Sequence, residues 1–459
     1  MPTPERGILS RRQKLGYATG SIAPGVFSTL PGLLLLYYLT NTLGVSAGLG
    51  GVIVLLPKIW DVIINPIVGI RSDGTKTRWG ARVPFIAAGS TLLAVTLAVL
   101  FAVPHLPLVW TCVWVLLAYT LCNTGYALFE TPYVAVPAEI TSDYDERTRL
   151  NAWRMVILTI GILVSGGVAP GIVSLAGNGR AGYALMGVVV GLLVLVTGLI
   201  SAREISRTPI VQVRATTAGL REQLRLMRAN KPFAALLGAY FGQTLAIGAQ
   251  LAAVPYFATY TMHDKGAVSV LFVGLVGPAL VVMPLWVRRS ERAGKSRAMV
   301  ESSLLYAGGS VLLVAAPSFP QAAIFGVAAL LGIGFAGMQM IPYAMLPDTI
   351  DAGAPEGETD EGQAGGLSGL WIGGETLGFA LGPAILAAIF AFAHFHSTVD
   401  AHAVPQTHSA LEAVRYGFAL LPPVLLLSTL PILTRYRLDD TARLGVTVAL
   451  EETADVQPA

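Results

Sequence analysis

Charged residues are scarce in this chain. Of its 459 residues, 12% are Asp, Glu, Lys or Arg, whereas a soluble domain carries about 25%. Hydrophobic residues make up 54% of the chain, and its mean hydropathy is +0.65. These values exclude an ordinary water-soluble fold and predict a protein embedded in a lipid bilayer. The basic residues behind the formal net charge of +3 lie in short loops, so we expect no nucleic-acid partner.

Cysteine and the signatures of catalysis are also rare or absent. Cys112 and Cys122 lie in one apolar run, about 15 Å apart on a helix and too far for a disulfide. No phosphate-binding sequence G-x4-G-K-[S/T] occurs, which excludes ATP hydrolysis of that type. Four histidines lie within 394–408 at spacings of 2, 6 and 6, which match no common metal-ligand pattern. We therefore expect neither an enzyme nor a cofactor.

Long apolar runs fill most of the chain. A membrane-spanning helix needs about 20 mostly apolar residues, and twelve runs satisfy this, although Gly and Pro recur inside them. Membrane helices tolerate such residues where neighbouring groups satisfy the freed backbone. The pattern predicts an all-α membrane protein with twelve transmembrane helices. The predicted spans are 15–41, 46–70, 83–103, 108–138, 154–176, 182–202, 232–260, 266–287, 298–316, 320–346, 366–393 and 414–435.

Basic residues gather on alternate connections between these runs. The N-terminus, the connections 71–82, 139–154, 203–231 and 288–297, and the C-terminal tail together hold 26 of the 30 Lys and Arg residues. Such loops face the cytoplasm. We therefore expect an even number of spans, with both termini cytoplasmic, in a bacterial inner (plasma) membrane.

The polar segment 203–231 divides the chain into two halves. Its Arg221, Arg225 and Arg228 have helical spacing and suggest an amphipathic helix on the membrane surface. The basic turn 71–82 after the second span reappears as 288–297 after the eighth, as in a duplicated transporter. We predict a monomer with a six-helix bundle in each half. The predicted bounds are 1–202 and 232–435 for the bundles, 203–231 for the cytoplasmic linker and 436–459 for the tail.

Ionisable residues inside a span are costly, and they mark candidate functional sites. Lys58 and Asp61 are three residues apart in the second span and share a helix face. They form either a neutralising pair or a cation or proton site whose carboxylate changes partner. Asn65 and Glu130 can complete a polar patch with Asp61, and Arg154 or Lys58 can neutralise Glu130.

Other polar residues suggest a substrate cavity and a cytoplasmic gate. Glu375 is an isolated acid in the eleventh span and can bind a cationic group or pair with a basic residue. The acidic segment 347–365 lacks Lys and Arg, and some of its acids can face the basic turns and latch a gate. Structural packing or solvation remains the alternative for each residue. The cavity candidates are Tyr133, Gln243, Gln250, Gln339, Tyr343, Trp371 and Glu375, and the gate candidates are Asp73, Arg78, Arg82, Asp348 and Asp351.

The sequence resembles a known transporter family. Gly69-x3-Asp73 followed by Arg78-x-Gly80-x-Arg82 is similar to the loop signature of the major facilitator superfamily. Further motifs resemble the glycoside–pentoside–hexuronide:cation symporters, the melibiose-carrier family. In order, they are Lys14–Tyr17, Lys58–Asp61, Asn65–Gly69, Thr131–Glu139, Asp145–Leu150 with Arg154, and Pro347–Asp351.

The resemblance implies a sodium, lithium or proton site in the first half, beside the substrate. Asp61 matches the first acid of that site, and Asn65 stands where the family has a second acid. Glu130 matches the acid of the fourth helix, so sodium could bind at Asp61 and Glu130. One fewer carboxylate favours a proton as the coupling ion.

Three positions depart from the sugar-binding pattern that the resemblance implies. Gly25 stands where the melibiose carrier has a sugar-binding aspartate. Val134 stands where it has a tryptophan, and Glu375 where a lysine is usual. These departures leave the substrate open.

The leading hypothesis is a secondary active transporter that couples a small organic solute, most simply a sugar or glycoside, to a cation or proton gradient. Its substrate would bind near the midplane between the bundles, and access would alternate between the two sides of the membrane. A carrier of lysophospholipid or another amphipathic solute is the alternative. A non-transporting membrane sensor or scaffold is a third, although it does not need intramembrane acids.

Overall fold

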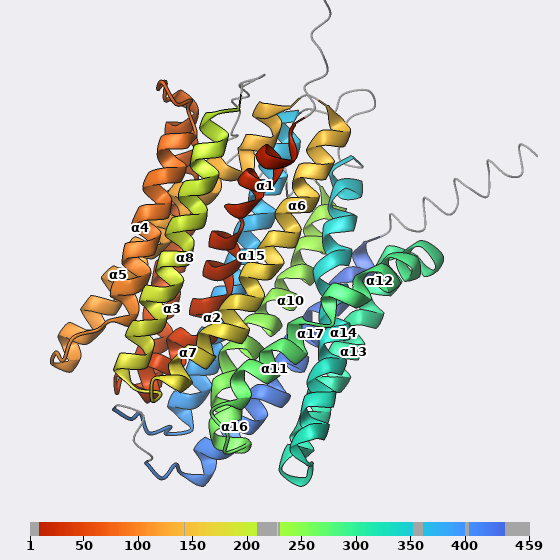
Figure 1. Ribbon diagram of the computed structural model, residues 1–459. Coiled ribbons are helices and arrows are strands. Elements are labelled where there is room, and N and C mark those ends of the chain that lie inside the picture. The colour runs from red at the N-terminus through yellow and green to blue at the C-terminus, as the bar shows by residue number, and fades with distance from the viewer. Residues whose placement is uncertain are drawn as a thin grey trace, which may run out of the picture. The chain divides into compact units, whose positions relative to one another are not determined.

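The computed structural model is helical throughout the part of the chain that it describes (Figure 1). It describes residues 9–141, 143–208, 227, 230–351, 361–399 and 404–436. Within these ranges the single departure from helices, turns and coil is an isolated β-bridge between Leu43 and Val399. Such a fold satisfies backbone hydrogen bonds inside each segment, as a bilayer requires.

The N-terminal part of the chain opens with a short helix whose Ser10 accepts a hydrogen bond from the Gln13 amide, forming a capping box. Longer helices follow, and a π-helical segment, η1, separates α6 from α7. The elements are α1 (Arg11–Thr19), α2 (Ile22–Asn41), α3 (Ala47–Gly74), α4 (Val83–Phe101), α5 (Leu108–Ile140), α6 (Tyr144–Leu163), η1 (Val164–Val168), α7 (Ala169–Leu175) and α8 (Arg180–Ser206).

The C-terminal part repeats this pattern of long helices with short irregular segments. A π-helical segment, η2, follows α10, and 3₁₀ segments end two further spans. The elements are α10 (Lys231–Tyr256), η2 (Phe257–Thr261), α11 (Ala267–Val276), α12 (Ala279–Ala293), α13 (Lys295–Leu312), η3 (Leu313–Ser318), α14 (Gln321–Asp351), α15 (Glu361–Phe392), α16 (His408–Ala419), α17 (Leu421–Thr429) and η4 (Leu430–Arg435).

Each predicted span coincides with a helix, or a helix pair, of sufficient length and hydropathy. In the described residues eleven helices qualify singly, and a twelfth span requires the pair His408–Ala419 and Leu421–Leu433, which is bent by 43°. Pro422 and Pro423 follow the break at Leu420, and proline fits the first turn of a new helix but not the interior of a continuous one. The predicted all-α membrane architecture is confirmed, with the last span broken.

Two glycines bring α2 directly against α6. A Cβ atom added at Gly25 would lie 2.3 Å from the Leu158 carbonyl oxygen, and one added at Gly161 would lie 2.9 Å from the Ile22 carbonyl oxygen. Small residues at membrane helix interfaces permit this close approach. The contact fixes α6, which carries Arg154, beside α2.

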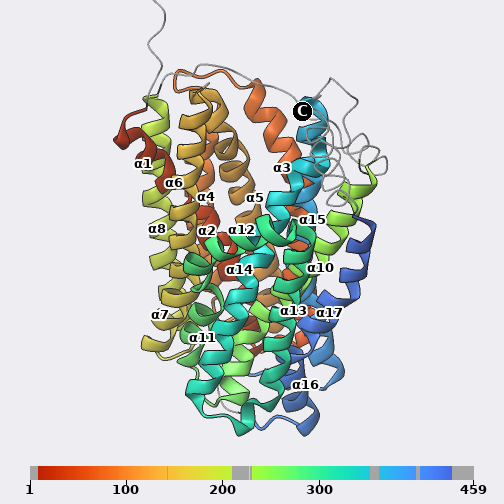
Figure 2. The ribbon, with the colours of Figure 1, turned by 90° about the vertical axis from the view of Figure 1, so that its right-hand side faces the viewer.

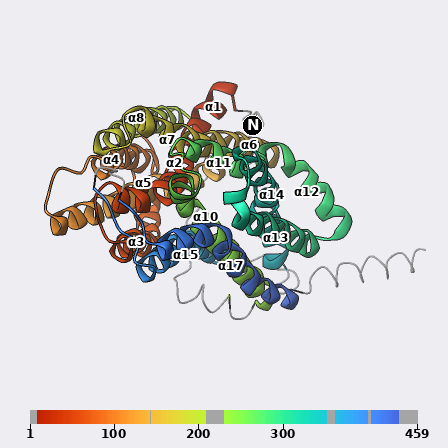
Figure 3. The ribbon, with the colours of Figure 1, turned by 90° about the horizontal axis from the view of Figure 1, so that it is seen from below.

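The chain forms two compact units. In the first unit, α4 packs against α5 and α8, and α3 packs against α5 (Figure 1). In the second unit, α14 packs against α12 and α13 (Figures 2 and 3). The first unit is Met1–Thr217, Gly248–Val273 and Phe379–Phe418, and the second is Ala218–Ile247, Gly274–Gly378 and Ala419–Ala459.

The predicted domain bounds at 202, 231 and 435 stay a prediction. Helix ends from the second half of the sequence belong to the first unit, and residues 209–226, 228, 229 and 437–459 lie outside the described residues. The expected surface helix with Arg221, Arg225 and Arg228, and the cytoplasmic tail, therefore lie outside the described residues as well.

Candidate functional site

Asp61 lies on α3 in the interior of the first unit, with a relative exposure of 2%. The Asn65 amide nitrogen, one turn later, donates to the Asp61 carbonyl oxygen at 2.8 Å and to its carboxylate Oδ1 at 3.2 Å. Residues four apart on a helix are neighbours. Asn65 therefore orients the Asp61 carboxylate from the same helix.

Thr131 continues this contact to α5. Its hydroxyl donates to the Asn65 amide oxygen at 2.9 Å, and it directly follows Glu130 in the chain. Because the Asn65 oxygen accepts from Thr131, the amide nitrogen of Asn65 is the group presented to Asp61. Sequence reasoning missed Thr131, although a hydroxyl beside an intramembrane acid was an available signal.

Glu130 and Arg154 form an ion pair between α5 and α6. The distance from Arg154 Nη2 to Glu130 Oε1 is 2.7 Å, and the two side chains are 17% and 18% exposed. The other carboxylate oxygen of Glu130 is buried and has no hydrogen-bond partner among the described residues. The Arg154 guanidinium also lies over the Tyr133 ring, 5.6 Å from its centroid. The pair neutralises both charges at membrane depth, where either alone would be costly.

Lys58 and Asp61 interact electrostatically, but the close contacts of the Lys58 ammonium are with aromatic rings. No ion pair of 4.0 Å or less joins Lys58 to Asp61 among the described residues. Its ammonium instead lies over the Phe27 ring, 4.7 Å from the centroid, and 5.8 Å from the centroid of Tyr119. The long side chain reaches α2 and α5, where the faces of aromatic rings attract a cation.

Tyr133 packs in the interior of the first unit. Its ring stacks on Tyr17, with centroids 4.7 Å apart, and its hydroxyl donates to the Tyr17 carbonyl oxygen at 2.8 Å. A second contact joins the hydroxyl to that of Ser21, also at 2.8 Å. The predicted cavity residue thus ties α5 to α1 and to the residues just before α2.

Three predicted cavity glutamines differ in burial. Gln243 and Gln250 are fully buried, and Gln243 donates to the Ser303 hydroxyl at 3.0 Å. Gln339 is half-buried on α14. Within the part of the chain that the structure describes, the buried side-chain oxygens of Gln243 and Gln339 have no hydrogen-bond partners, so both retain an acceptor for a ligand or water.

Glu375 lies in a tyrosine–tryptophan cluster of the second unit. The Tyr240 hydroxyl donates to its Oε1 at 2.8 Å, and the Tyr343 hydroxyl to its Oε2 at 2.6 Å. The Tyr240 and Trp371 rings stack with centroids 4.4 Å apart. The structure thus brings together three predicted cavity residues. Sequence reasoning missed Tyr240, which lies one turn before Gln243 on α10.

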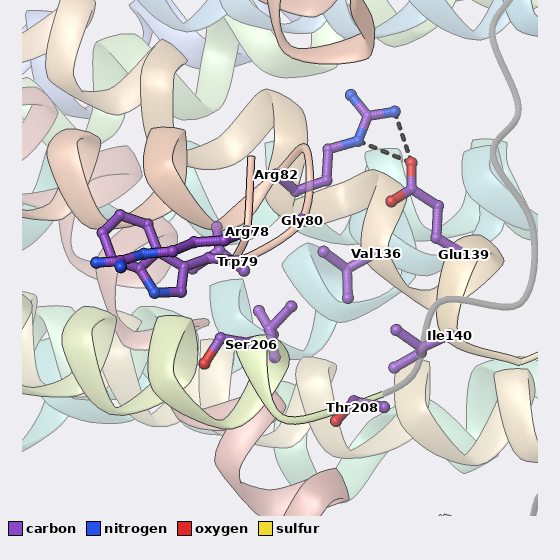
Figure 4. A pocket seen from close by; sticks show the side chains of 11 residues that line it. Arg78, Trp79, Gly80, Arg82, Val136, Glu139, Ile140, Ser206 and Thr208 are labelled. Atoms are coloured by element: carbon purple, nitrogen blue, oxygen red, sulfur yellow. Dashed lines mark hydrogen bonds and ion pairs between the residues drawn. The ribbon is translucent and has the colours of Figure 1, made fainter. Parts of the chain in front are cut away.

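The first basic turn is held by Arg82. Its guanidinium pairs with Asp73, and its Nε donates to Glu139 Oε1 at 2.8 Å. Arg78 lies over the neighbouring Trp79 ring at 4.4 Å. Figure 4 shows the cavity that Arg82, Glu139 and the Arg78–Trp79 stack line, with a volume of about 240 Å³.

The second basic turn, in the second unit, is also held by ion pairs between its basic side chains and nearby acids. Lys295 pairs with Asp348 at 2.6 Å and donates to the Ala344 carbonyl oxygen at 3.0 Å. Arg289 pairs with Glu301 at 2.5 Å. Arg82 contacts the C-terminal end of α5, and Lys295 the C-terminal end of α14, so each turn is tied to a long helix of its own unit. Asp351 ends α14, and its side chain lies outside the described residues.

A family model decides the identification. The model described as MFS/sugar transport protein matches residues 16–440. The chain belongs to this family. It is therefore a membrane transporter rather than an enzyme, as the scarcity of charge and the lack of catalytic motifs predicted.

Curated relatives are similar along most of their length. The inner membrane symporter YicJ of Escherichia coli is 24% identical, over 94% of this chain and 92% of that protein. The isoprimeverose transporter of Lactiplantibacillus pentosus is 25% identical, over 90% and 85%. The sodium-dependent lysophosphatidylcholine symporter 1 of Mus musculus is 24% identical, over 75% and 70%.

A solved structure shares the fold. A bacterial homologue of the human lysosomal transporter Spinster, in an inward-facing conformation, aligns with a TM-score of 0.69. The alignment covers 96% of this chain and 99% of that one, at 14% sequence identity. The chain thus has the major facilitator fold, as the motifs from Gly69 to Arg82 predicted.

Proposed function

We propose that this protein is a symporter that uses a cation or proton gradient to accumulate a small organic solute, with a sugar or glycoside as the substrate class. The similarity to an inner membrane symporter and to an isoprimeverose transporter supports this function. It also supports a bacterial inner membrane location. The distribution of Lys and Arg supports cytoplasmic termini.

The polar connection from Asp61 to Arg154 carries the proposal. It runs through Asn65 and Thr131 to the neighbouring Glu130 and crosses three helices of the first unit. A cation or proton that binds at Asp61 changes the charge beside Asn65, and the hydrogen bonds extend that change to α5. Coupling needs only that this binding favours the conformation that also binds substrate.

The orientation of Asn65 favours a proton over sodium. Sodium is a hard cation and binds oxygen ligands, as other hard cations do. Asn65 directs its amide nitrogen to Asp61, while its oxygen accepts from Thr131. Glu130 is already paired with Arg154. A proton requires only the Asp61 carboxylate, so we propose proton coupling, with sodium at Asp61 and Glu130 as the competing assignment.

A lysophospholipid is the second candidate substrate, because the mouse relative is a lysophosphatidylcholine symporter. That similarity covers less of this chain than the similarity to the isoprimeverose transporter. A sensor or scaffold that moves no solute is disfavoured by the intramembrane acids, which such a protein does not need. Uptake assays with isoprimeverose and lysophosphatidylcholine separate the three functions.

The deciding experiment is uptake into vesicles reconstituted with the purified protein, under an imposed pH or sodium gradient. We expect wild-type protein to concentrate isoprimeverose or a related glycoside, and we expect the pH gradient to suffice. Asp61→Asn should abolish accumulation above equilibrium while downhill exchange persists, because the variant can bind no proton at this position. Asp264→Asn, in the loop after η2, is the matched control and should behave as wild type.

Two results would contradict the proposal in different ways. Wild-type accumulation by Asp61→Asn would remove Asp61 from coupling but leave transport intact. Failure of wild-type protein to move any tested glycoside or lysolipid, with or without gradients, would contradict the proposed symport and favour the sensor or scaffold.

A further inference from the structure

Glu375 is an acid inside a membrane span. It belongs to the span Leu367–Phe392, and no Lys, Arg or His of the described residues lies within 4.0 Å of its carboxylate. Glu130, by contrast, pairs with Arg154 at 2.7 Å. A carboxylate at this depth is costly unless a cation or hydrogen bonds compensate it.

Hydrogen bonds hold the Glu375 carboxylate but leave it able to accept more. Tyr240 and Tyr343 each donate to one oxygen, whereas an ionised carboxylate has about four acceptor sites. Tyr240 and Trp371 are fully buried and stacked on each other. They fix the carboxylate in place, and no ligand can enter between their rings.

Tyr343 provides the accessible side of this cluster. Its side chain is 46% exposed, and its ring meets those of Tyr240 and Trp371 edge-on, with centroids 5.9 and 5.8 Å away. Glu375 is itself partly exposed. Ionisable residues within membrane spans almost always face the interior of the helix bundle or a water-filled cavity rather than lipid.

We propose that Glu375 and Tyr343 form a subsite for an organic ammonium group carried by the substrate. The proposal rests on the proposed transport function and adds to its glycoside substrates a preference for solutes that carry a positively charged amine. Aromatic faces beside a carboxylate suit a large, weakly hydrated ammonium ion. Sodium instead needs several oxygen ligands, and the oxygen groups that contact this carboxylate in the described residues are two phenol hydroxyls that already donate to it.

Choline and its uncharged isostere, 3,3-dimethylbutan-1-ol, test this subsite directly. Their shapes match, and only choline carries the charge. A ligand that binds the folded state stabilises it by an amount that grows with the logarithm of the ratio of ligand concentration to Kd. We expect choline to raise the unfolding temperature of the detergent-purified protein progressively as its concentration increases and the isostere to leave it unchanged. Equal effects of the two compounds would overturn the proposal.

Two variants assign the effect to these residues. Glu375→Gln keeps the shape of the side chain and should weaken choline binding by about thirtyfold or more, since it removes the charge of a desolvated pair. Tyr343→Phe keeps the ring but loses one donor, and should weaken binding less. Retention of the wild-type choline response by Glu375→Gln would overturn the proposal even if Tyr343→Phe had an effect.

Matched controls lie elsewhere on the chain. Glu412→Gln replaces an exposed acid on α16, and Tyr306→Phe removes a buried hydroxyl for which the described residues offer no hydrogen-bond partner. Both should keep the wild-type choline response. The unfolding temperature of each variant without ligand shows whether the variant is folded. If Glu375→Gln is misfolded, Glu375→Asp is used instead; it keeps the negative charge and should retain choline binding.

The uptake assay separates this inference from the proposed function. Accumulation of an uncharged glycoside together with no response to choline would overturn the ammonium subsite and leave the transporter intact. A choline response lost in Glu375→Gln, without uptake of any solute, would count against transport and not against the subsite. Lysophosphatidylcholine, tested in parallel, shows whether the ammonium group comes from a lipid headgroup or a small solute.

Discussion

The acids Asp61, Glu130 and Glu375 lie inside apolar spans, and each is compensated differently. Glu130 has an arginine, Asp61 has the amide of Asn65, and Glu375 has two phenols. An intramembrane acid in a close ion pair is stable but unresponsive, whereas one whose hydrogen bonds come from neutral donors can still bind a proton or a cation. If the protein transports as proposed, Glu130 is the fixed acid and Asp61 the responsive one in the first unit, and Glu375 is the responsive acid in the second unit.

Removal of Arg154 should destabilise the protein strongly. In Arg154→Gln the Glu130 carboxylate loses its counter-charge at a position that is 18% exposed. Breaking a buried pair in this way costs about 3–5 kcal/mol. The free energy of unfolding, from titration of the detergent-solubilised protein with SDS, should fall by this amount. Arg154→Gln/Glu130→Gln should recover most of the loss, because neither charge then remains.

An exposed ion pair provides the control for this comparison of the single and double variants. Arg297 pairs with Glu301 at 3.2 Å, and the Arg297 side chain is 72% exposed. Arg297→Gln should change the free energy of unfolding by less than about 1 kcal/mol. If the double variant at Glu130 and Arg154 proved no more stable than Arg154→Gln alone, the pair would not be the source of the loss.

Partners close in the sequence were predictable, and distant ones were not. Asp61 and Asn65 share a helix face, so their contact follows from spacing alone. The Glu130–Arg154 pair was expected as one of two options for Glu130. The contacts of Thr131 with Asn65, Glu139 with Arg82 and Tyr240 with Glu375 join different helices. Helix spacing does not determine which faces meet, so these partners required the structure.

At the scale of the helix, Gly25 explains one departure from the sugar-binding pattern. The melibiose-carrier resemblance places an aspartate at this position, but here the α2 backbone contacts the Leu158 carbonyl of α6. A side chain at Gly25 would separate two helices that small residues bring together. The first half of the chain therefore uses this position for packing, and a substrate must find its polar contacts elsewhere.

Two glycines of α2 should respond oppositely to the same substitution. Gly25→Ala places a methyl group 2.3 Å from a backbone oxygen, and such overpacking costs about 1–3 kcal/mol. At Gly32 nothing lies within 4 Å of an added Cβ, so Gly32→Ala should leave the protein unchanged or stabilise it by up to about 1 kcal/mol. SDS titration of the two variants measures both effects, and equal losses would show that the α2–α6 contact can relax.

Hydropathy predicted the spans because the bilayer imposes one length on all of them. The predicted runs and the observed helices agree from Arg11–Asn41 to the last pair, His408–Ala419 and Leu421–Leu433. The break in that pair was not predicted, because the run from 414 to 435 is apolar on both sides of it. Pro422 and Pro423 were the available signal, although prolines inside α2, α5 and α14 leave those helices continuous. Neighbouring groups decide which prolines break a membrane helix.

At the scale of the whole molecule, hydroxyl groups connect distant parts of the first unit at the end opposite to the basic turn 71–82. The hydroxyls of Tyr37 and Thr259 lie 2.9 Å apart, and those of Thr40 and Tyr256 lie 2.6 Å apart. The Thr398 amide also donates to the Thr40 carbonyl oxygen at 2.8 Å. These contacts join α2 to segments more than 200 residues away, which the sequence alone could not pair.

Alternating access requires contacts on one side of the membrane to break while those on the other side form. If the protein transports as proposed, the hydroxyl contacts of α2 with Thr259 and Tyr256 must open in every cycle. A covalent link between Tyr37→Cys and Thr259→Cys should therefore stop uptake into vesicles. A bifunctional methanethiosulfonate makes this link, and dithiothreitol reverses it, so uptake should disappear and then return. Each single variant treated with the same reagent should keep transporting. This result would show that modification of the native Cys112 and Cys122 does not cause the loss of uptake. Undiminished uptake by the cross-linked double variant would show that this end of the first unit stays closed throughout the cycle, and alternating access would then need another opening.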